Sequence, residues 1–561
     1  MVGWYNPSQL ARTGVKTVVS ALFGERADFR AMEALSQRPV EHDCAAGQGD
    51  AWVDYVSDTG DGFAATYAVA SLLGRPAVEV AVEGATRALP RGRVLIMGGD
   101  EVYPTPSPEA YAQRLVGPYA SALPFEEGAA DAERPALFAV PGNHDWYDGL
   151  GAFMGLFAAG KTVGNWRTPQ ERSYFVLRLP HRVWLFGVDL QLSHDVDRGQ
   201  LEAMLDIGRA RAIGHGDRVI LCTPEPDWAY RASELEAHVP EQLDALREAL
   251  HARGAAVVLQ LAGDLHHYRR QSDAGNRRHL VTAGGGGAFV HPTHTSPPGP
   301  YDTLGGTYTD QKSFPSAKQS KRLSWGNWRF LAHNGWFGAT TAAVYVILGL
   351  VMPPAEMPPG PWYAFVPLLA LDGLARVREN VASMTWMIVV IAGFFAFTDT
   401  RVRWYRYVAG LTHGLAHLGA ALVGGVLAHA VSDAAYVSVT GLFGDKSWIH
   451  DRVAKIASLV AYVLSLGAWG YVIGAALFGA YLLGSVRLFG RHGNEAFSAL
   501  RCEGYKHFLR MRIAPDAIEV FVVGLDAVPR AKSYAWRDGR WRLSDAKALA
   551  PHLVDRFEAR A

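Results

Sequence analysis

Two short segments of the chain carry side chains that could bind metal ions. The first is Gly99-Asp100-Glu101-Val102-Tyr103, and the second is Gly142-Asn143-His144-Asp145. Each follows a short apolar run of strand-forming residues, 94–97 and 137–140. Carboxylate, phenol and amide oxygens suit Mn, Mg or Fe, and an imidazole adds affinity for the later divalent metals. Two such ions held close together can bind a phosphoryl group and activate water near neutral pH.

The same pattern recurs on both sides of these segments. The run 52–57 precedes Asp58-Thr59-Gly60, and the run 256–261 precedes Gly263-Asp264-Leu265-His266. Any one of these segments alone would be typical of an ordinary turn or of a helix cap. Four in succession, each after a strand-like run, predict one site at the carboxyl ends of strands in an α/β domain.

This series of motifs resembles the calcineurin-like metallophosphoesterase superfamily, over roughly residues 50 to 290. The motifs of that family run D-x-H or D-x-G, GD-x-x-D/Y, GNH-D/E, a histidine at a strand end, and GH-x-H. The D-x-G and GD-x-x-Y variants found here are most similar to purple acid phosphatases. The resemblance implies a β-sandwich flanked by helices, whereas the periodicity alone would also allow a doubly wound sheet.

The resemblance implies a role for each residue that matches a motif. Two divalent ions, Mn, Mg, Fe or Zn, are the implied cofactors. His144 would protonate the leaving group, and Asp145 would orient the ring of His144. Asn143 would bind the second ion. The first ion would be held by four side chains, with Asp100 also bridging to the second: Asp58, Asp100, Tyr103 and His266.

Two positions depart from the family pattern. Glu225, between two prolines, follows the strand-like run that should end in a histidine, and Asp264 replaces the first histidine of GH-x-H. Glu225 and Asp264 could supply oxygen ligands and create a harder second site that favours Mn or Mg. Alternatively, the second site is weakened or lost.

From about residue 335 the composition changes. Four stretches contain no Asp, Glu, Lys or Arg: 335–352, 381–398, 407–432 and 456–486. Each is long enough to cross about 30 Å of hydrocarbon at about 1.5 Å per residue. Residues 362–371 include Pro367 and are too short to span, so we expect them to lie in the interface. The sequence therefore predicts an integral membrane protein with four spans.

The charges that flank these stretches predict their orientation. With four spans, most arginines and lysines fall on one side, including Arg401, Arg403, Arg406 and Arg487. The positive-inside rule then places both termini and the catalytic domain in the cytoplasm. Three scattered cysteines are too few for a disulfide framework. The net formal charge of zero gives no indication of nucleic-acid binding.

Three histidines lie inside the predicted spans. His413 and His417 are four residues apart and share a helix face, and His429 lies further along the same stretch. Ionisable groups within spans are candidates for function. These histidines could be neutral groups hydrogen-bonded between helices, or could serve a metal, a haem or a proton relay.

Together these features predict four regions: a metallophosphoesterase domain at 1–300, a linker at 301–334, a transmembrane domain at 335–486 and a small α+β cytoplasmic tail at 487–561. In the tail we expect a helix over 494–512, a strand over 517–523 and a hairpin that turns at 537–539. The predicted activity is hydrolysis of a phosphomonoester or phosphodiester, and a lipid-linked phosphoester is one candidate substrate. The alternative is a transport or sensor protein that binds a phosphorylated ligand without turnover.

Overall fold

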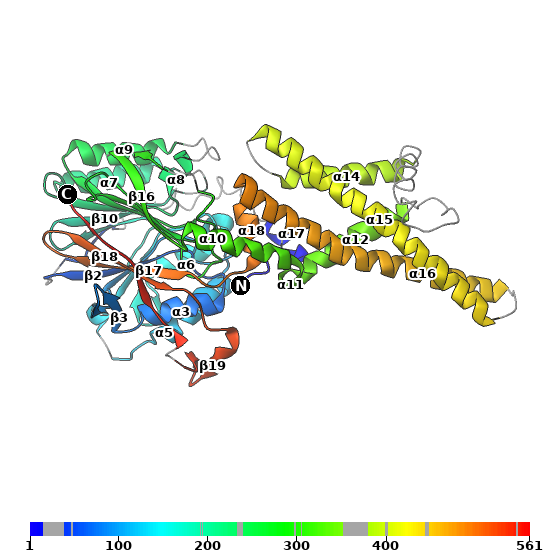
Figure 1. Ribbon diagram of the computed structural model, residues 1–561. Coiled ribbons are helices and arrows are strands. Elements are labelled where there is room, and N and C mark those ends of the chain that lie inside the picture. Colours follow the sequence, from blue (N-terminus) through cyan, green and yellow to red (C-terminus); the bar gives the residue numbers. More distant parts are fainter. Residues whose placement is uncertain are drawn as a thin grey trace. The chain divides into compact units, whose positions relative to one another are not determined.

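The computed structural model describes residues 1–9, 11–14, 39–45, 49–128, 130–190, 192, 195–232, 239–296, 299–303, 306–351, 380–398, 402–443, 448–545 and 548–561. The chain folds into two compact units (Figure 1). The first, here called the sheet unit, comprises Met1–Val2, Ala11–Arg322 and Arg501–Ala561. The second, the helical unit, comprises Gly3–Leu10 and Leu323–Leu500.

The sheet unit is built on two large mixed sheets. One has eight strands in the order β21-β18-β17-β2-β5-β6-β8-β7, and the other has nine in the order β1-β9-β10-β11-β12-β14-β13-β16-β15. The strands of the first are β2 (Ala51–Val56), β5 (Val94–Met97), β6 (Ala136–Ala139), β7 (Thr162–Val163), β8 (Trp166–Arg167), β17 (Lys506–Ile513), β18 (Ile518–Leu525) and β21 (His552–Ala559). Those of the second are β1 (Glu41–Asp43), β9 (Phe175–Leu179), β10 (Val183–Gly187), β11 (Arg218–Cys222), β12 (Ala256–Ala262), β13 (Tyr268–Ser272), β14 (His279–Ala283), β15 (Tyr301–Thr303) and β16 (Gly306–Phe314).

One hydrophobic core joins the two sheets. Tyr55 and Ile96 from the eight-stranded sheet are fully buried in the same cluster as Leu185 and Leu261 from the nine-stranded sheet. Helices α3 (Phe63–Leu73), α5 (Gly117–Ala122) and α6 (Gly151–Phe157) cover the outer face of the first sheet. Helices α7 (Arg198–Ala210) and α9 (Glu241–Ala252) cover the second, on the opposite side (Figure 1). The predicted α/β class is confirmed.

Two predicted boundaries differ from the observed units. The predicted linker contains β15 and β16, and β16 pairs antiparallel with β13 in the nine-stranded sheet. The predicted tail is not separate, because β17, β18 and β21 complete the eight-stranded sheet. The helix expected over 494–512 ends at Leu500, where α18 (Gly493–Leu500) stops. Residues 506–513 become a strand instead because they pair with both β2 and β18.

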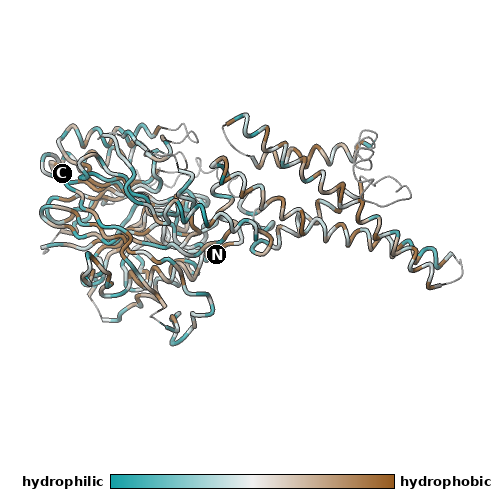
Figure 2. The backbone as a smooth tube through the Cα atoms, viewed as in Figure 1, coloured by the Kyte–Doolittle hydropathy of each residue, from teal (hydrophilic) through white to brown (hydrophobic). Residues whose placement is uncertain are grey.

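The helical unit contains long apolar helices. These are α12 (Gly335–Val351), α14 (Val381–Phe397), α15 (Arg403–Phe443) and a continuous run of α16 (Trp448–Trp469), η5 (Gly470–Gly474), α17 (Ala475–Gly484) and η6 (Ser485–Phe489). Within the described parts of the chain, two helices are long and apolar enough to cross a membrane, Arg403–Leu442 and Trp448–Phe489. They become three if Ala317–His333 and Gly335–Val351 are counted as one bent span. Figure 2 shows the apolar residues along these helices.

Two of the four predicted spans lie on helices long enough to cross a membrane, and the other two lie on shorter helices. The stretches 407–432 and 456–486 lie on the two helices that meet the criterion. Helices α12 and α14 have 17 residues each. Such a helix measures about 26 Å, slightly less than the hydrocarbon core. The predicted interfacial segment 362–371 lies outside the described residues.

The histidines of α15 lie in different surroundings. His417 is buried, and its Nδ1 lies 3.1 Å from the Tyr345 hydroxyl, as a hydrogen bond between helices requires. His413 is also buried and stacks on Tyr481, with 3.9 Å between the ring centroids. His429 lies against the ring of Tyr462. The hydrogen-bonded interpretation therefore fits His417, whereas His413 is held by ring packing.

Candidate metal centre

The candidate ligands follow strands of both sheets, where parallel strands end. Asp58 follows β2 and Asp100 follows β5, and Asp264 and His266 follow β12. Asp58, Asp100 and Asp264 have positive φ angles of 59°, 54° and 65°. This conformation is uncommon for residues other than glycine and concentrates at functional sites. The strand ends thus present three aspartates in a backbone conformation that packing alone seldom requires.

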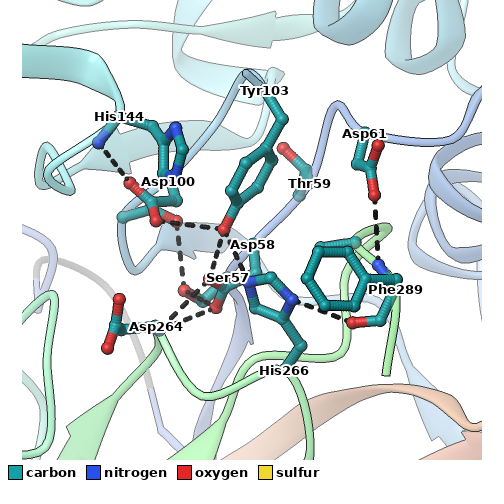
Figure 3. A network of polar contacts seen from close by, with 12 residues as sticks. Ser57, Asp58, Thr59, Asp61, Asp100, Tyr103, His144, Asp264, His266 and Phe289 are labelled. Atoms are coloured by element: carbon teal, nitrogen blue, oxygen red, sulfur yellow. Dashed lines mark hydrogen bonds and ion pairs between the residues drawn. The ribbon is translucent and has the colours of Figure 1, made fainter. Parts of the chain in front are cut away.

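Three of the predicted ligands converge on one atom of the fourth, the hydroxyl oxygen of Tyr103 (Figure 3). That oxygen lies 2.7 Å from Asp58 Oδ1, 3.0 Å from Asp100 Oδ2 and 2.8 Å from His266 Nε2. None of the four residues is more than 4% exposed. The structure therefore brings together every residue that the motifs assigned to the first ion. We call this group the Tyr103 cluster.

The Tyr103 cluster has more hydrogen-bond acceptors than protons. His266 Nδ1 lies 2.8 Å from the carbonyl oxygen of Phe289, which can only accept, so the ring proton belongs on Nδ1 and Nε2 is an acceptor. The single hydroxyl proton of Tyr103 thus faces three acceptors. Burial raises the pKa of Asp58 to about 6 and that of Asp100 to about 7. The cluster favours uptake of protons or of a cation.

A divalent cation fits the donor set of this cluster. Two carboxylates, a phenol and an imidazole are ligands for Mn, Fe or Zn. Among the described residues, no three His, Cys, Asp or Glu side chains have the spacing of a metal site. The side chains instead close on the Tyr103 hydroxyl, which occupies the centre of the group (Figure 3).

Glycines allow the backbone to approach the two central carboxylates. A Cβ atom on Gly263 would lie 2.6 Å from Asp58 Oδ2, and one on Gly284 would lie 2.5 Å from the same atom. A Cβ atom on Gly142 would collide with Asp100. The glycines beside the acidic motifs are therefore required by close packing around the ligands.

The residues predicted for the second ion do not share such a centre. The backbone N–H of Asp264 donates to both carboxylate oxygens of Asp58, at 3.1 and 3.0 Å, but its own carboxylate contacts the Tyr230 hydroxyl. Burial, then the charges of Asp100 and Glu225, raise the pKa of Asp264 well above its usual range.

Asn143 is directed to a different partner. Its Nδ2 donates to the Tyr147 hydroxyl at 3.3 Å. Glu225 is half-buried, and its charge contributes to the raised pKa of Asp264. The second set therefore lacks the shared contact that defines the Tyr103 cluster.

His144 is positioned differently from the expectation. Its backbone N–H donates to Asp100 Oδ1 at 2.9 Å, and its Nδ1 lies 2.8 Å from the carbonyl oxygen of Pro104. Asp145 does not orient this ring, because its carboxylate accepts from Gly142 N, Glu101 N and the Tyr111 hydroxyl. The role predicted for Asp145 is thus corrected: this carboxylate holds the turn that carries Asn143 and His144.

Lys506 is a residue of the site region that no motif indicated. It lies on β17 and is fully buried, and its amine donates to the carbonyl oxygen of Ala288. The N–H of Ala288 donates to the Asp58 carbonyl at 2.9 Å, and the next residue, Phe289, orients His266. Burial lowers the pKa of Lys506 to about 8. Lys506 therefore fixes the loop that is hydrogen-bonded to two residues of the Tyr103 cluster, Asp58 and His266.

A buried ion pair holds β17 in place beside β2. Arg510 donates to both oxygens of Asp54, at 2.7 and 2.9 Å, and to the carbonyl oxygen of Leu89. Arg510 and Asp54 are almost completely buried. Removing one partner of such a pair is costly because the other charge stays buried. The strand that follows the helical unit is thus an integral support of the site.

Comparisons with known proteins place the chain at a distance from them. No protein-family model matches it. No curated protein matches it. Among solved structures, it is similar to one titled "Structure of PhoD", with 9% identity and a TM-score of 0.26, over 44% of this chain and 59% of that one. The chain spans less than two thirds of the length of that protein. At this score the likeness carries no argument about activity.

Proposed function

We propose that the chain is a membrane-bound, metal-dependent phosphoesterase of the calcineurin-like type. The observation that carries the proposal is the convergence of Asp58, Asp100 and His266 on the hydroxyl of Tyr103. These residues come from three separate motifs that are far apart in the sequence. The fold brings them together at the carboxyl ends of β2, β5 and β12. The order of the motifs supports the family, and the excess of acceptors supports a cation.

In the proposed reaction, the Tyr103 cluster would hold one ion, and Asn143, Glu225 and Asp264 would contribute to a second. Bound divalent ions would stabilise the charge of the phosphoryl oxygens and activate water as a nucleophile. The chain itself contributes the positioning. The loop fixed by Lys506 holds the ring of His266, and the glycines let the backbone close around Asp58 and Asp100.

His144 would act as the general acid. Its Nδ1 lies beside a carbonyl oxygen, so the proton of the neutral ring belongs there and Nε2 is the nitrogen that gains and donates a proton. The bond from its backbone N–H to Asp100 fixes the residue beside the phosphoryl site. Protonation of the leaving oxygen by such a group accelerates ester cleavage.

We also propose that the helical unit crosses the membrane an even number of times. Residues before and after this unit belong to one sheet, since β17 pairs with β2. Both ends of the helical unit must therefore lie on the same side of the bilayer, and the basic flanks favour the cytoplasmic side. A lipid-linked phosphoester is the substrate class that such a tether suits best.

The decisive experiment uses the purified full chain. Mn, Mg, Fe or Zn is added to metal-free protein, and hydrolysis of an aryl phosphodiester and an aryl phosphomonoester is measured. Glu79→Gln, an exposed change on β3 (Ala77–Val82), serves as the matched control for Asp58→Asn. We expect metal-dependent turnover that Asp58→Asn removes and Glu79→Gln retains. Turnover that is equal in the two variants would contradict the proposal.

A second candidate is a ligand-binding sensor without turnover. The engagement of Asp264 by Tyr230 and of Asn143 by Tyr147 favours it, because these side chains are directed to other partners. The same experiment separates the two functions. A sensor would bind metal ions and phosphate but hydrolyse neither ester.

A further inference from the structure

The hairpin formed by β19 (Tyr534–Arg537) and β20 (Arg540–Leu543) has two chemically distinct faces. The pairing places Trp536 opposite Trp541 and Tyr534 opposite Leu543, so one face is aromatic and apolar. Arg537 lies opposite Arg540 on the other face. The two-residue turn between the strands has positive φ angles of 51° at Asp538 and 70° at Gly539, as tight hairpins require.

The base of the hairpin is firmly attached to the sheet unit. Tyr534 and Trp541 pack against α3, and the Tyr67 hydroxyl donates to the Trp541 carbonyl at 2.8 Å. The Tyr534 hydroxyl in turn donates to the carbonyl of Ala64 at 3.2 Å. Trp536, at the end of the same face, is nevertheless 59% exposed. This tryptophan therefore projects from a well-packed support and is not part of a loosely folded segment.

The hairpin and the residues just before it are strongly basic. Residues 530–543 contain five basic side chains and one acidic side chain, a net charge of +4. Arg542 pairs with Asp538 at 2.9 Å. Within the described part of the chain, no ion pair is formed by Lys532, Arg537 or Arg540. The cations are thus available to an external anionic surface.

A second hairpin of the same unit shows that this composition is not a general property of its turns. Strands β3 and β4 (Ala85–Pro90) also join through a two-residue turn, with positive φ at Glu83 and Gly84. That hairpin carries Glu79 and Glu83 and no aromatic residue. Its Glu83 pairs with Arg556, and its Arg87 pairs with Glu519. The β3–β4 hairpin is net acidic and pairs Glu83 and Arg87 with residues of neighbouring strands. The β19–β20 hairpin is aromatic and net basic, and only its Arg542 and Asp538 form an ion pair among the described residues.

We propose that the β19–β20 hairpin docks the sheet unit onto an anionic lipid surface. Tryptophan prefers the headgroup level of a bilayer, and lysine and arginine are attracted to anionic lipids. Only residues 501–505 join the helical unit to β17, so the chain tethers the sheet unit to the membrane in which the helical unit would lie. The inference rests on the proposed membrane placement of the helical unit and is independent of catalysis.

The test places a probe on each hairpin of the full chain. In a background with Cys44→Ser and Cys502→Ser, a fluorophore is attached to Asp538→Cys, at an exposed turn position that leaves Trp536 in place. The matched control carries it at Glu83→Cys, the equivalent position of the β3–β4 turn. Each protein is reconstituted into phosphatidylcholine vesicles or into an equal mixture of phosphatidylcholine and phosphatidylserine. Both vesicles contain a nitroxide-labelled lipid that quenches only fluorophores at the bilayer surface. Arg537→Glu combined with Arg540→Glu tests the charges, at one exposed and one half-buried position of the hairpin.

We expect quenching at position 538 in the anionic vesicles only, with loss of quenching at high salt or with the double glutamate change. The probe at position 83 should stay unquenched in both lipids. Equal quenching of position 538 in both lipids would overturn the proposal, because the tether alone would then explain it. Absence of quenching, or a response of the probe to a soluble polyanion but not to the vesicles, would also overturn it.

Discussion

The two sets of candidate ligands differ in how completely the fold prepares them. In the Tyr103 cluster, buried side chains meet within hydrogen-bond distance of one hydroxyl, and Lys506 and the Pro104 carbonyl fix the loops around them. In the second set, Asn143 and Asp264 are directed to the hydroxyls of tyrosines. The second set also contains both departures from the family motifs. A site of this kind should therefore bind one ion tightly and the other weakly.

Among the substitutions considered, Asp100→Ala should have the largest effect on turnover and metal binding. Asp100 belongs to the Tyr103 cluster, and its other oxygen accepts from His144 N, so its loss affects both sets of ligands. We expect turnover and bound metal to be lost together, measured as ester hydrolysis and as metal content of the same sample. Retained turnover with two ions still bound would refute the bridging role.

Replacing His144 with alanine should separate acid catalysis from metal binding. We expect metal content to stay nearly intact while turnover falls by about 10²–10⁴, the usual contribution of a general acid. The loss should be smaller for a nitrophenol ester than for an alkyl ester, because a good leaving group needs little protonation. A variant that loses metal, or that slows both esters equally, would show that His144 is not the acid.

Lys506→Met tests whether the buried lysine of β17 is needed to hold the Tyr103 cluster in place. Methionine keeps the length of the side chain but leaves the Ala288 carbonyl without its donor. An unpaired buried acceptor costs about 1–3 kcal/mol, and we expect weaker binding of the tight ion. Lys506→Arg should recover part of that affinity. If both variants bind the ion as the natural chain does, Lys506 has no positioning role.

Asp264→His addresses the weaker set by restoring the nitrogen ligand of the family motif. An imidazole favours the later divalent metals, so the weak ion should shift its preference from Mn toward Zn. The tight ion should be unaffected, because Asp264 contributes only its backbone N–H to Asp58. Competition between Mn and Zn at equilibrium measures the shift. An unchanged preference would mean that Asp264 is not a ligand.

The convergence of the Tyr103 cluster could be expected from the sequence because each of its side chains lies within a short motif that resembles a known family. The role of these side chains as metal ligands stays a prediction. Asp58 and Asp100 follow neighbouring parallel strands of one sheet, so their proximity follows from that pairing. His266 follows β12 of the other sheet, so its approach to them also requires the packing of the two sheets. Lys506 could not be predicted, since its position depends on pairing with β2, far away in the sequence. The local pattern of residues 506–513 also suited a helix, and only the two partner strands make it a strand. Pro104 was not predicted to orient His144 because carbonyl groups leave no signal in a sequence.

Proton uptake by the Tyr103 cluster gives its metal affinity a defined pH dependence. Burial raises the pKa of Asp58 to about 6 and of Asp100 to about 7 in the metal-free protein. Between the ordinary carboxyl pKa of 3.8 and these raised values, the folded, metal-free site binds more protons than the unfolded chain, so its stability falls as pH rises toward about 7. A cation must displace these protons. Its affinity should be full above about pH 7 and decline as the pH falls through about 6.

The most direct test of the central claim is an equilibrium titration of the full, metal-free chain with Mn²⁺, with ester hydrolysis followed in the same samples at several pH values. We expect one tight and one weaker ion, turnover that rises only as the weaker ion binds, and a loss of tight binding in acid. Turnover without bound Mn²⁺ or another divalent ion, or tight binding that Asp58→Asn leaves unchanged, would contradict a metal-dependent phosphoesterase centred on Tyr103.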